Sequence, residues 1–244
     1  MCRGTKAPDY PMSGIHYDTS KALDRLKAGF PNIEKDVYGK CVVDFGCGHG
    51  YQLIALLKAG AAAVVGIEAD EKLLANAIDR VKEAGFSDGI RVEQKLSPEL
   101  RADVIISQNS FEHFLEPERI LDELKNALAL NGRIYVTFGP PWYAPWGAHT
   151  AFFCRVPWIH LFFSERTIME VRSLYRADGA RSYYEGGLAQ MSISKFERVV
   201  RDSGLRTIFS QYDCVRGIRP LRNLPGLREL FINRVNCVLD LGRG

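Results

Sequence analysis

The sequence lacks the features that mark several common classes of protein. Its 244 residues include six cysteines, but no two have C-x-x-C spacing, so we expect neither a zinc site nor a disulfide framework. No apolar run reaches the roughly 18 residues that would indicate a membrane-spanning helix. The first residues lack the apolar core of a signal peptide. We therefore expect a cytoplasmic protein without a bound metal.

Composition and charge are those of an ordinary globular chain. Hydrophobic residues make up 46% and charged residues 25%, which excludes a disordered or collagen-like chain. The formal net charge is +3, although the basic residues of 151–244 are nearly all arginines. This basic third could meet an anionic substrate, a membrane surface or nucleic acid, or it could be a solvated face.

Strand-like and helix-like segments alternate in the first part of the chain. Five short apolar runs are expected to be parallel strands: 42–45, 64–67, 90–92, 104–107 and 134–138. Three amphipathic segments between them are expected to be helices: 51–58, 71–84 and 117–131. This order predicts a parallel sheet with helices on both faces.

The alternation stops after the fifth strand. Residues 139–191 are rich in proline and aromatic residues, and one helix is expected there, at 165–177, with Ser164 as its N-cap. We interpret 139–191 as a lid insertion. Residues 1–39 are interpreted as an N-terminal cap with a helix at 20–29.

The alternating pattern resumes near the C-terminus. The segment Ser194–Glu197 predicts a capping box that starts a helix, and the runs 205–210 and 231–239 are expected to be the last two strands. The chain, 1–244, is therefore predicted to be a single α/β domain. Its core is a doubly wound, mostly parallel, seven-stranded sheet.

A glycine-rich turn follows the first expected strand, at Asp44–Gly50. Its alternate glycines and the helix after them let a ligand approach the backbone. Glu68 ends the second strand, where a carboxylate can accept hydrogen bonds from both hydroxyls of a ribose. The G-x-G-x-x-G pattern of dinucleotide sites is absent, since Tyr51 and Leu53 stand where the last glycine would. The acid at the turn would repel a pyrophosphate and suits a ligand with an ammonium group, which favours S-adenosylmethionine.

Four stretches in order resemble the motifs of class I S-adenosylmethionine-dependent methyltransferases: Asp44–Gly50, Val65–Glu68, Ala102–His113 and Asn131–Phe138. The resemblance covers residues 38–138. It implies a Rossmann-like fold, S-adenosylmethionine as cofactor and S-adenosylhomocysteine as product. It also implies a set of cofactor-binding residues: Asp44, Gly46, Cys47, Gly48, Glu68, Ala69, Asp70, Asn109 and Ser110. The acid that the family often carries near the adenine is absent, and Gln94 and Leu96 are the candidates for that contact.

We expect the insertion and the N-terminal segment to form the binding site of the methyl acceptor. Apolar walls with a few polar tips suit a small-molecule pocket, and four aromatic residues are candidates for it: Tyr17, Trp142, Tyr143 and Trp146. His149 is the first candidate for a general base, followed by His113 and His16. Glu112 and His113 could instead have no catalytic role and only cap and pack the start of a helix. The sequence around His160 is that of a histidine buried in an apolar core.

These observations predict methyl transfer to an O or N atom of a small-molecule acceptor, such as a natural product, a sugar or a lipid-linked intermediate. A nucleic-acid acceptor is an alternative, although N-P-P followed by an aromatic residue is absent after the fourth strand and no RNA-binding module is visible. A non-catalytic S-adenosylmethionine-binding protein is another. A nicotinamide-dependent reductase is disfavoured, because its Tyr-x-x-x-Lys pair would follow the nucleotide motif, whereas Tyr17 and Lys21 precede it.

Overall fold

The computed structural model describes residues 18–217 and 227–242 of the chain. The described strands form one sheet in the order β3-β2-β1-β4-β5-β7-β6. Their bounds are Cys41–Phe45 (β1), Ala63–Ile67 (β2), Ile90–Glu93 (β3), Ala102–Gln108 (β4), Leu128–Phe138 (β5), Arg206–Cys214 (β6) and Ile232–Asp240 (β7). Strands β1 to β5 are parallel, and β7 runs antiparallel to both β5 and β6. The expected doubly wound, mostly parallel seven-stranded sheet is confirmed.

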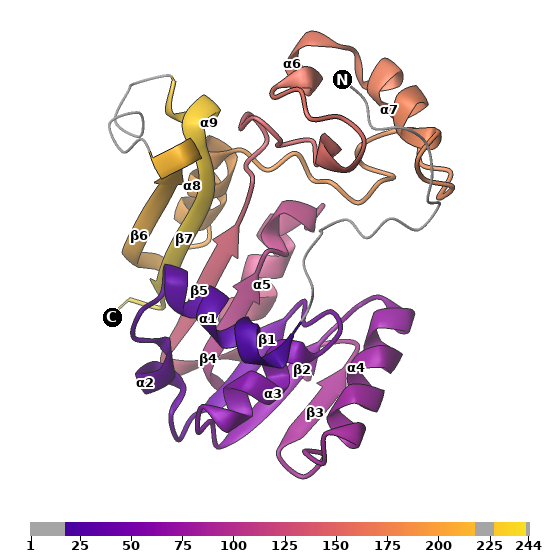
Figure 1. Ribbon diagram of the computed structural model, residues 1–244. Helices are drawn as coiled ribbons and strands as arrows, with labels where there is room; N and C mark the ends of the chain where they lie inside the picture. Colours follow the sequence, from indigo (N-terminus) through magenta and orange to yellow (C-terminus); the bar gives the residue numbers. More distant parts are fainter. Residues whose placement is uncertain (1–17, 218–226, 243–244) are drawn as a thin grey trace.

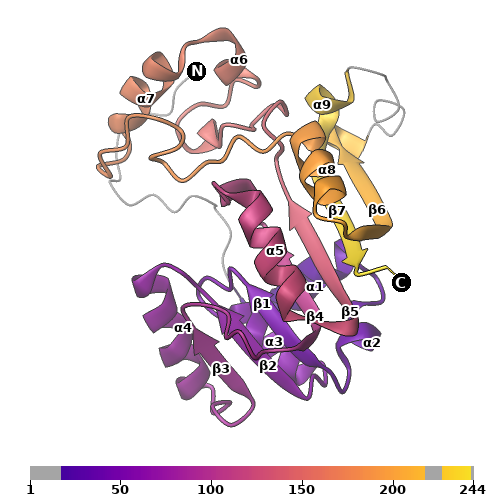
Figure 2. The ribbon, with the colours of Figure 1, turned by 180° about the vertical axis from the view of Figure 1, so that it is seen from behind.

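Helices cover both faces of this sheet, as the two opposite views show (Figures 1 and 2). One face carries α1 (Thr19–Gly29), α2 (Ile33–Val37), α3 (Tyr51–Lys58) and α4 (Glu71–Glu83). The other carries α5 (Pro117–Ala127) and α8 (Ile193–Asp202). Neighbouring residues of β1, Val42 and Val43, are both fully buried but belong to opposite cores, as expected for a strand covered on both faces. Among the described residues, no helix is long and apolar enough to cross a membrane.

The insertion lies above the ends toward which β4 and β5 point (Figure 1). It contains α6 (Ile159–Phe162) and α7 (Glu165–Ser173) and has a small apolar core of its own, which includes Phe153 and Met169. Ser164 is the N-cap of α7, as predicted, and its Oγ accepts a hydrogen bond from the Thr167 N–H at 3.3 Å. The helix ends at Ser173, four residues earlier than expected.

The junction of α5 and β5 differs from the sequence prediction. The helix ends at Ala127 and the strand begins at Leu128, so the expected helix end at Asn131–Gly132 is wrong. Leu128 pairs with Ala102 of β4, and the register then shifts. Gly132 lies so close to this edge that a Cβ would come within 2.9 Å of the Ala102 carbonyl oxygen. The Asn-Gly pair therefore belongs to an irregularity in the strand.

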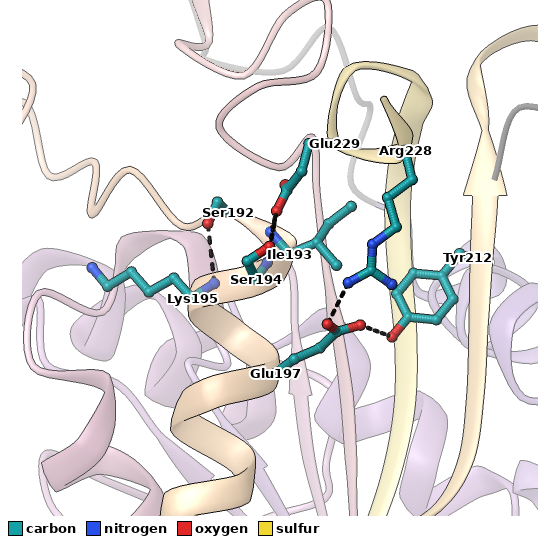
Figure 3. Close-up of polar contacts among 8 residues, drawn as sticks. All are labelled: Ser192, Ile193, Ser194, Lys195, Glu197, Tyr212, Arg228 and Glu229. Carbon is teal, nitrogen blue, oxygen red and sulfur yellow. Dashed lines mark hydrogen bonds and ion pairs between the residues drawn. The ribbon is translucent and has the colours of Figure 1, made fainter. Parts of the chain in front are cut away.

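The start of α8 also differs. Its N-cap is Ser192, whose Oγ accepts a hydrogen bond from the Lys195 N–H at 3.1 Å. The predicted N-cap, Ser194, instead donates from its N–H and its hydroxyl to the Glu229 carboxylate, at 2.8 and 2.6 Å (Figure 3). Glu229 belongs to α9 (Arg228–Phe231). A partner 35 residues away along the chain thus replaces the local capping box.

The other half of the predicted capping box is also wrong. The Glu197 carboxylate does not turn back to the helix start; it accepts a hydrogen bond from the Tyr212 hydroxyl at 2.7 Å and forms an ion pair with Arg228 (Figure 3). Glu197 therefore joins α8 to β6 and to α9.

The observed N-cap predicts the effect of removing its hydroxyl. Ser192→Ala should lower the free energy of unfolding by about 1 kcal/mol, because the Lys195 N–H loses its acceptor. Ser192→Thr keeps an acceptor oxygen and should retain most of the stability. Urea unfolding followed by circular dichroism measures both, and equal stabilities of the alanine and threonine variants would contradict the assignment.

Candidate functional site

A cavity of about 440 Å³ opens at the carboxyl ends of the central strands. Its walls come from the glycine turn after β1, from the ends of β2 and β4 and from α1. Seven of the predicted cofactor residues line it: Asp44, Gly46, Cys47, Gly48, Glu68, Asn109 and Ser110. An adjoining groove of about 860 Å³ shares Gly46 and Glu68 with the cavity and is lined by Ala69, Gln94 and Leu96.

Asp44 is a buried acid at the cavity wall. Its side chain comes from the end of β1 and is only 2% exposed. Oδ1 accepts a hydrogen bond from Gln52 Nε2 at 3.0 Å, whereas Oδ2 has no hydrogen-bond partner among the described residues. Burial raises the pKa of the carboxyl to about 7, against the opposing effect of the Gln52 hydrogen bond. One buried oxygen thus remains available to a ligand donor.

Two glycines of the turn are required for different reasons. Gly46 has a φ of +82°, and a Cβ there would lie 2.9 Å from the Ser110 Cβ, so a side chain would be both strained and crowded. Gly48 has a φ of +54°, and a Cβ there would meet no atom within 4 Å. Its surface is open toward the cavity that it lines. Burial raises the pKa of the neighbouring Cys47 thiol, which therefore stays neutral.

The Glu68 carboxylate holds the turn in place. Oε2 accepts a hydrogen bond from the Gly48 N–H at 2.8 Å, and Oε1 accepts one from the Asp70 N–H at 3.0 Å. Each carboxylate oxygen has a second lone pair, so both can still accept from ribose hydroxyls. The Asp70 side chain caps α4 instead, since its Oδ1 accepts from the Lys72 and Leu73 N–H groups at 2.9 and 3.0 Å.

The end of β4 forms the opposite wall. Asn109 adopts a left-handed conformation with a φ of +53°, and its N–H donates to the Thr137 carbonyl at 2.7 Å. Ser110 Oγ donates to the Gln108 carbonyl at 3.3 Å. These bonds hold both residues at the cavity edge.

Glu112 and His113 connect the sheet to both ends of the insertion. The Gly139 N–H donates to the Glu112 carboxylate at 3.5 Å, and the Ala189 N–H donates to the Glu112 carbonyl at 2.9 Å. His113 Nδ1 donates to the Gly187 carbonyl at 2.7 Å, because a carbonyl oxygen can only accept. Burial raises the pKa of Glu112 to about 7. Their short helical turn therefore anchors the insertion where it leaves and rejoins the sheet.

His149, from the insertion, lies beside His113, with the ring centroids 5.4 Å apart. Burial, together with the charge of His113, lowers the pKa of His149 to about 4, so its imidazole is neutral at pH 7. His113 lines both the 440 Å³ cavity at the strand ends, here called the large cavity, and a small cavity inside the insertion. His149 also lines the small cavity. His16 and Tyr17 lie outside the described residues.

The predicted substrate-binding aromatics take different places in the insertion. Trp142 packs its ring against His160 and Tyr183, with centroid distances of 4.8 and 4.9 Å. Its carbonyl accepts a hydrogen bond from His160 Nε2 at 2.7 Å, which confirms His160 as a core histidine. Tyr143 is 41% exposed, and the Trp146 carbonyl accepts from the His149 N–H at 2.9 Å.

Sequence reasoning missed several residues of the cavity. Ala22 and Arg25 of α1 line it, as do Gln52 and Phe114. Gln52 stands two residues after the glycine turn, and its position at the start of a helix was the available signal. Helix α1 reaches the cavity because it packs on α3, and no local sequence pattern shows such a contact.

The site fits S-adenosylmethionine on two observations. The partnerless buried oxygen of Asp44 suits an ammonium donor, and the open backbone at Gly48 admits a ligand where a Cβ would stand. Glu68 can accept from a ribose, and the adjoining groove, with Leu96 in its wall, can take the adenine.

A family model described as a methyltransferase domain matches residues 15–208. The chain belongs to the methyltransferase-domain family. Residues 15–208 therefore form a methyltransferase domain. The methyltransferase is 34% identical over 97 residues to the ribosomal protein L11 methyltransferase of Photobacterium profundum, covering 39% of this chain and 31% of that protein. The chain thus spans about a third of the length of the curated relatives that it matches.

Solved structures share the fold of this methyltransferase. An S-adenosylmethionine dependent methyltransferase from Mesorhizobium loti has a TM-score of 0.59 and 19% identity, over 94% of this chain and 99% of that one. Magnesium protoporphyrin IX methyltransferase from Synechocystis, with bound S-adenosylhomocysteine, has a TM-score of 0.53 and 17% identity, over 90% and 82% of the two chains.

The raised pKa of Asp44 predicts pH-dependent binding. Below pH 7 the carboxyl is mostly protonated, and above it the carboxylate can attract an ammonium group. Affinity for S-adenosylhomocysteine should therefore increase between pH 6 and 8 by up to about tenfold. Asp44→Asn should bind more weakly, with little pH dependence in this range. Calorimetric titration at several pH values measures both, and a parallel pH profile in the variant would contradict the role.

The two hydrogen bonds of Glu68 predict that cofactor affinity falls in steps as its acceptor oxygens are removed. Glu68→Gln keeps one acceptor oxygen and Glu68→Ala keeps none, so S-adenosylhomocysteine affinity should fall in that order. The alanine variant should lose about tenfold or more and on the order of 1–3 kcal/mol of unfolding free energy. Glu83→Ala, at the exposed far end of α4, is the matched control. Calorimetry and urea unfolding test this, and unchanged binding in Glu68→Ala would refute it.

Proposed function

We propose that this methyltransferase acts on an O or N atom of a small-molecule acceptor that binds between the cofactor cavity and the insertion. The observation that carries the proposal is the position of His113, which lines both the large cavity and the small cavity of the insertion. An acceptor that spans the two would place its reacting atom at His113.

His113 has the chemistry for taking a proton from the acceptor. Because Nδ1–H donates to the Gly187 carbonyl, the neutral ring carries its proton on Nδ1 and leaves a lone pair on Nε2. When bound, S-adenosylmethionine supplies an electrophilic methyl group. His113 would receive the proton of the acceptor's hydroxyl or ammonium group on Nε2, and the Gly187 carbonyl would keep the ring oriented.

His149 remains the alternative proton acceptor. Its pKa of about 4 makes the neutral imidazole a weak base, and it lies on the insertion side of His113. Besides the base, the protein would contribute alignment of the two reactants, because the insertion lies above the ends toward which β4 and β5 point (Figure 1).

A protein acceptor is the second candidate, because the relative from Photobacterium profundum is a ribosomal protein L11 methyltransferase. The match covers 31% of that relative, so the remaining two thirds of that protein have no counterpart in the match. The cavity of the insertion, which is small and lined mostly by buried residues, favours a small molecule.

The acceptor class is tested with S-adenosylmethionine that carries a tritiated methyl group. The purified protein is incubated separately with the small-molecule, protein and RNA fractions of a cell extract. Label in the small-molecule fraction supports the proposal. Label confined to protein or RNA would overturn it.

The role of His113 predicts a separation of turnover from binding. His113→Asn keeps an N–H that can reach the Gly187 carbonyl but has no proton acceptor comparable to Nε2. Turnover of an acceptor hydroxyl should fall by about 100-fold or more, while S-adenosylhomocysteine affinity is largely retained. His149→Asn, measured beside it, should have the smaller effect. A larger loss in His149→Asn would move the role to His149.

A further inference from the structure

Three buried polar atoms around one cavity of the insertion have no hydrogen-bond partner among the described residues. They are Thr150 Oγ1, Tyr183 Oη and His149 Nε2, and all three side chains line the same cavity of about 30 Å³. Thr150 is 1% exposed and Tyr183 is 6% exposed. Buried polar groups are nearly always paired, and leaving one unpaired costs about 1–3 kcal/mol. Three such atoms around one cavity indicate a polar ligand.

Arg172 adds a positive charge to this cavity. It is 9% exposed and lines the cavity together with the three polar residues. Its guanidinium forms two hydrogen bonds with the Asp178 carboxylate, at 2.7 and 2.5 Å. These bonds are the main cause that lowers the pKa of Asp178 to about 2, so the pair is ionised at neutral pH.

The two charges of this pair do not face the cavity equally. The Asp178 side chain is 42% exposed, whereas that of Arg172 is 11% exposed, so water screens the negative charge far more than the positive one. Glu165, the other nearby acid, is exposed and accepts a hydrogen bond from the Tyr183 N–H. The lining of the cavity therefore includes the Arg172 guanidinium and two hydroxyl donors, and it includes no acidic side chain among the described residues.

The size of the cavity limits the ligand group. About 30 Å³ is roughly twice the 10–15 Å³ that a cavity needs to hold one water molecule, so the cavity admits a small planar group such as a carboxylate and disfavours a bulkier tetrahedral phosphate. A carboxylate offers two oxygens with about four lone-pair sites. Arg172, Thr150 and Tyr183 can all donate to such a group.

We propose that the insertion cavity binds a carboxylate of the methyl acceptor, held by Thr150, Tyr183 and Arg172. This inference rests on the proposed function, since His113 connects this cavity to the cofactor cavity. The substrate class is then a small carboxylic acid that carries a second, nucleophilic O or N atom. With its carboxylate in the insertion, that second atom lies on the His113 side.

The binding group is tested with acetate as probe and acetamide as its neutral counterpart. The protein contains five histidines, so ¹⁵N-histidine labelling gives a simple spectrum in which His149 is assigned from the His149→Asn variant. The full-length protein is first saturated with S-adenosylhomocysteine. Acetate should shift the His149 ring signals in a saturable way, and acetamide should not. Equal responses to the two probes, or no saturable shift with acetate, would overturn the inference.

Two variants test the named donors. Thr150→Val and Tyr183→Phe should each weaken acetate binding by about tenfold. Because each removes a buried atom that has no partner, neither should lower the melting temperature of the free protein. Tyr184→Phe is the matched control, since Tyr184 is 66% exposed, and it should leave acetate binding unchanged. Equal acetate binding in all three variants would contradict the assignment.

The labelled product separates this inference from the proposed function. If the methylated small molecules carry a carboxylate, the tritium should bind a strong anion exchanger at pH 11, where an amine is neutral, and pass through at pH 2. Label in small molecules that the exchanger does not retain would overturn the carboxylate and leave the proposed function standing. Label confined to protein or RNA would overturn the proposed function.

Discussion

The arrangement of the site depends on the Glu68 carboxylate, which holds the turn after β1 from the end of β2. With one oxygen on the Gly48 N–H and the other on the Asp70 N–H, it joins the two strand ends that flank the cavity. The turn can take this shape only because Gly46 and Gly48 adopt positive φ. Asp44 lies just before this turn, and Ser110 Oγ donates to the Gly46 carbonyl at 3.5 Å, so the carboxylate that holds the turn also helps to position the walls of the cofactor cavity. A ribose whose hydroxyls donate to the remaining lone pairs of Glu68 would be held by the group that also shapes the turn.

The Glu112–His113 turn after β4 is the second feature on which the site depends, because it holds the insertion. It bonds to the insertion both where the chain leaves the sheet, at Gly139, and where it returns, at Gly187 and Ala189. His113 also lines both cavities, so one residue anchors the insertion and lies at the wall of each cavity. A change in the position of the insertion would therefore move His113 relative to the cofactor cavity.

The parts of this structure that local patterns determine could be predicted from the sequence. The strands, the glycine turn and the acid at the end of β2 follow from short apolar runs and from residue spacing, and the structure brings Asp44, Gly48 and Glu68 to one cavity. The predictions that were wrong concern residues whose structure depends on partners distant in the sequence. Glu229 bonds to Ser194 and leaves the N-cap to Ser192, and Ala102 pairs with Leu128 where a helix was expected. The insertion was visible only as a break in the alternation, because its aromatic rings pack on one another and no periodic pattern describes that.

The charges of the two cavities explain why an acidic acceptor would bind in one direction. The lining of the cofactor cavity includes the carboxyl groups of Asp44 and Glu68 as well as Arg25, and that of the insertion cavity includes the Arg172 guanidinium and no acid among the described residues. In the proposed binding mode, the acceptor carboxylate lies in the insertion cavity, away from the two acids, and leaves its other nucleophilic atom near His113. His149, neutral because burial lowers its pKa to about 4, adds no charge between them. Binding of the cofactor's ammonium group would favour the ionised form of Asp44, so the charge of this carboxylate is compensated by the cofactor that it holds.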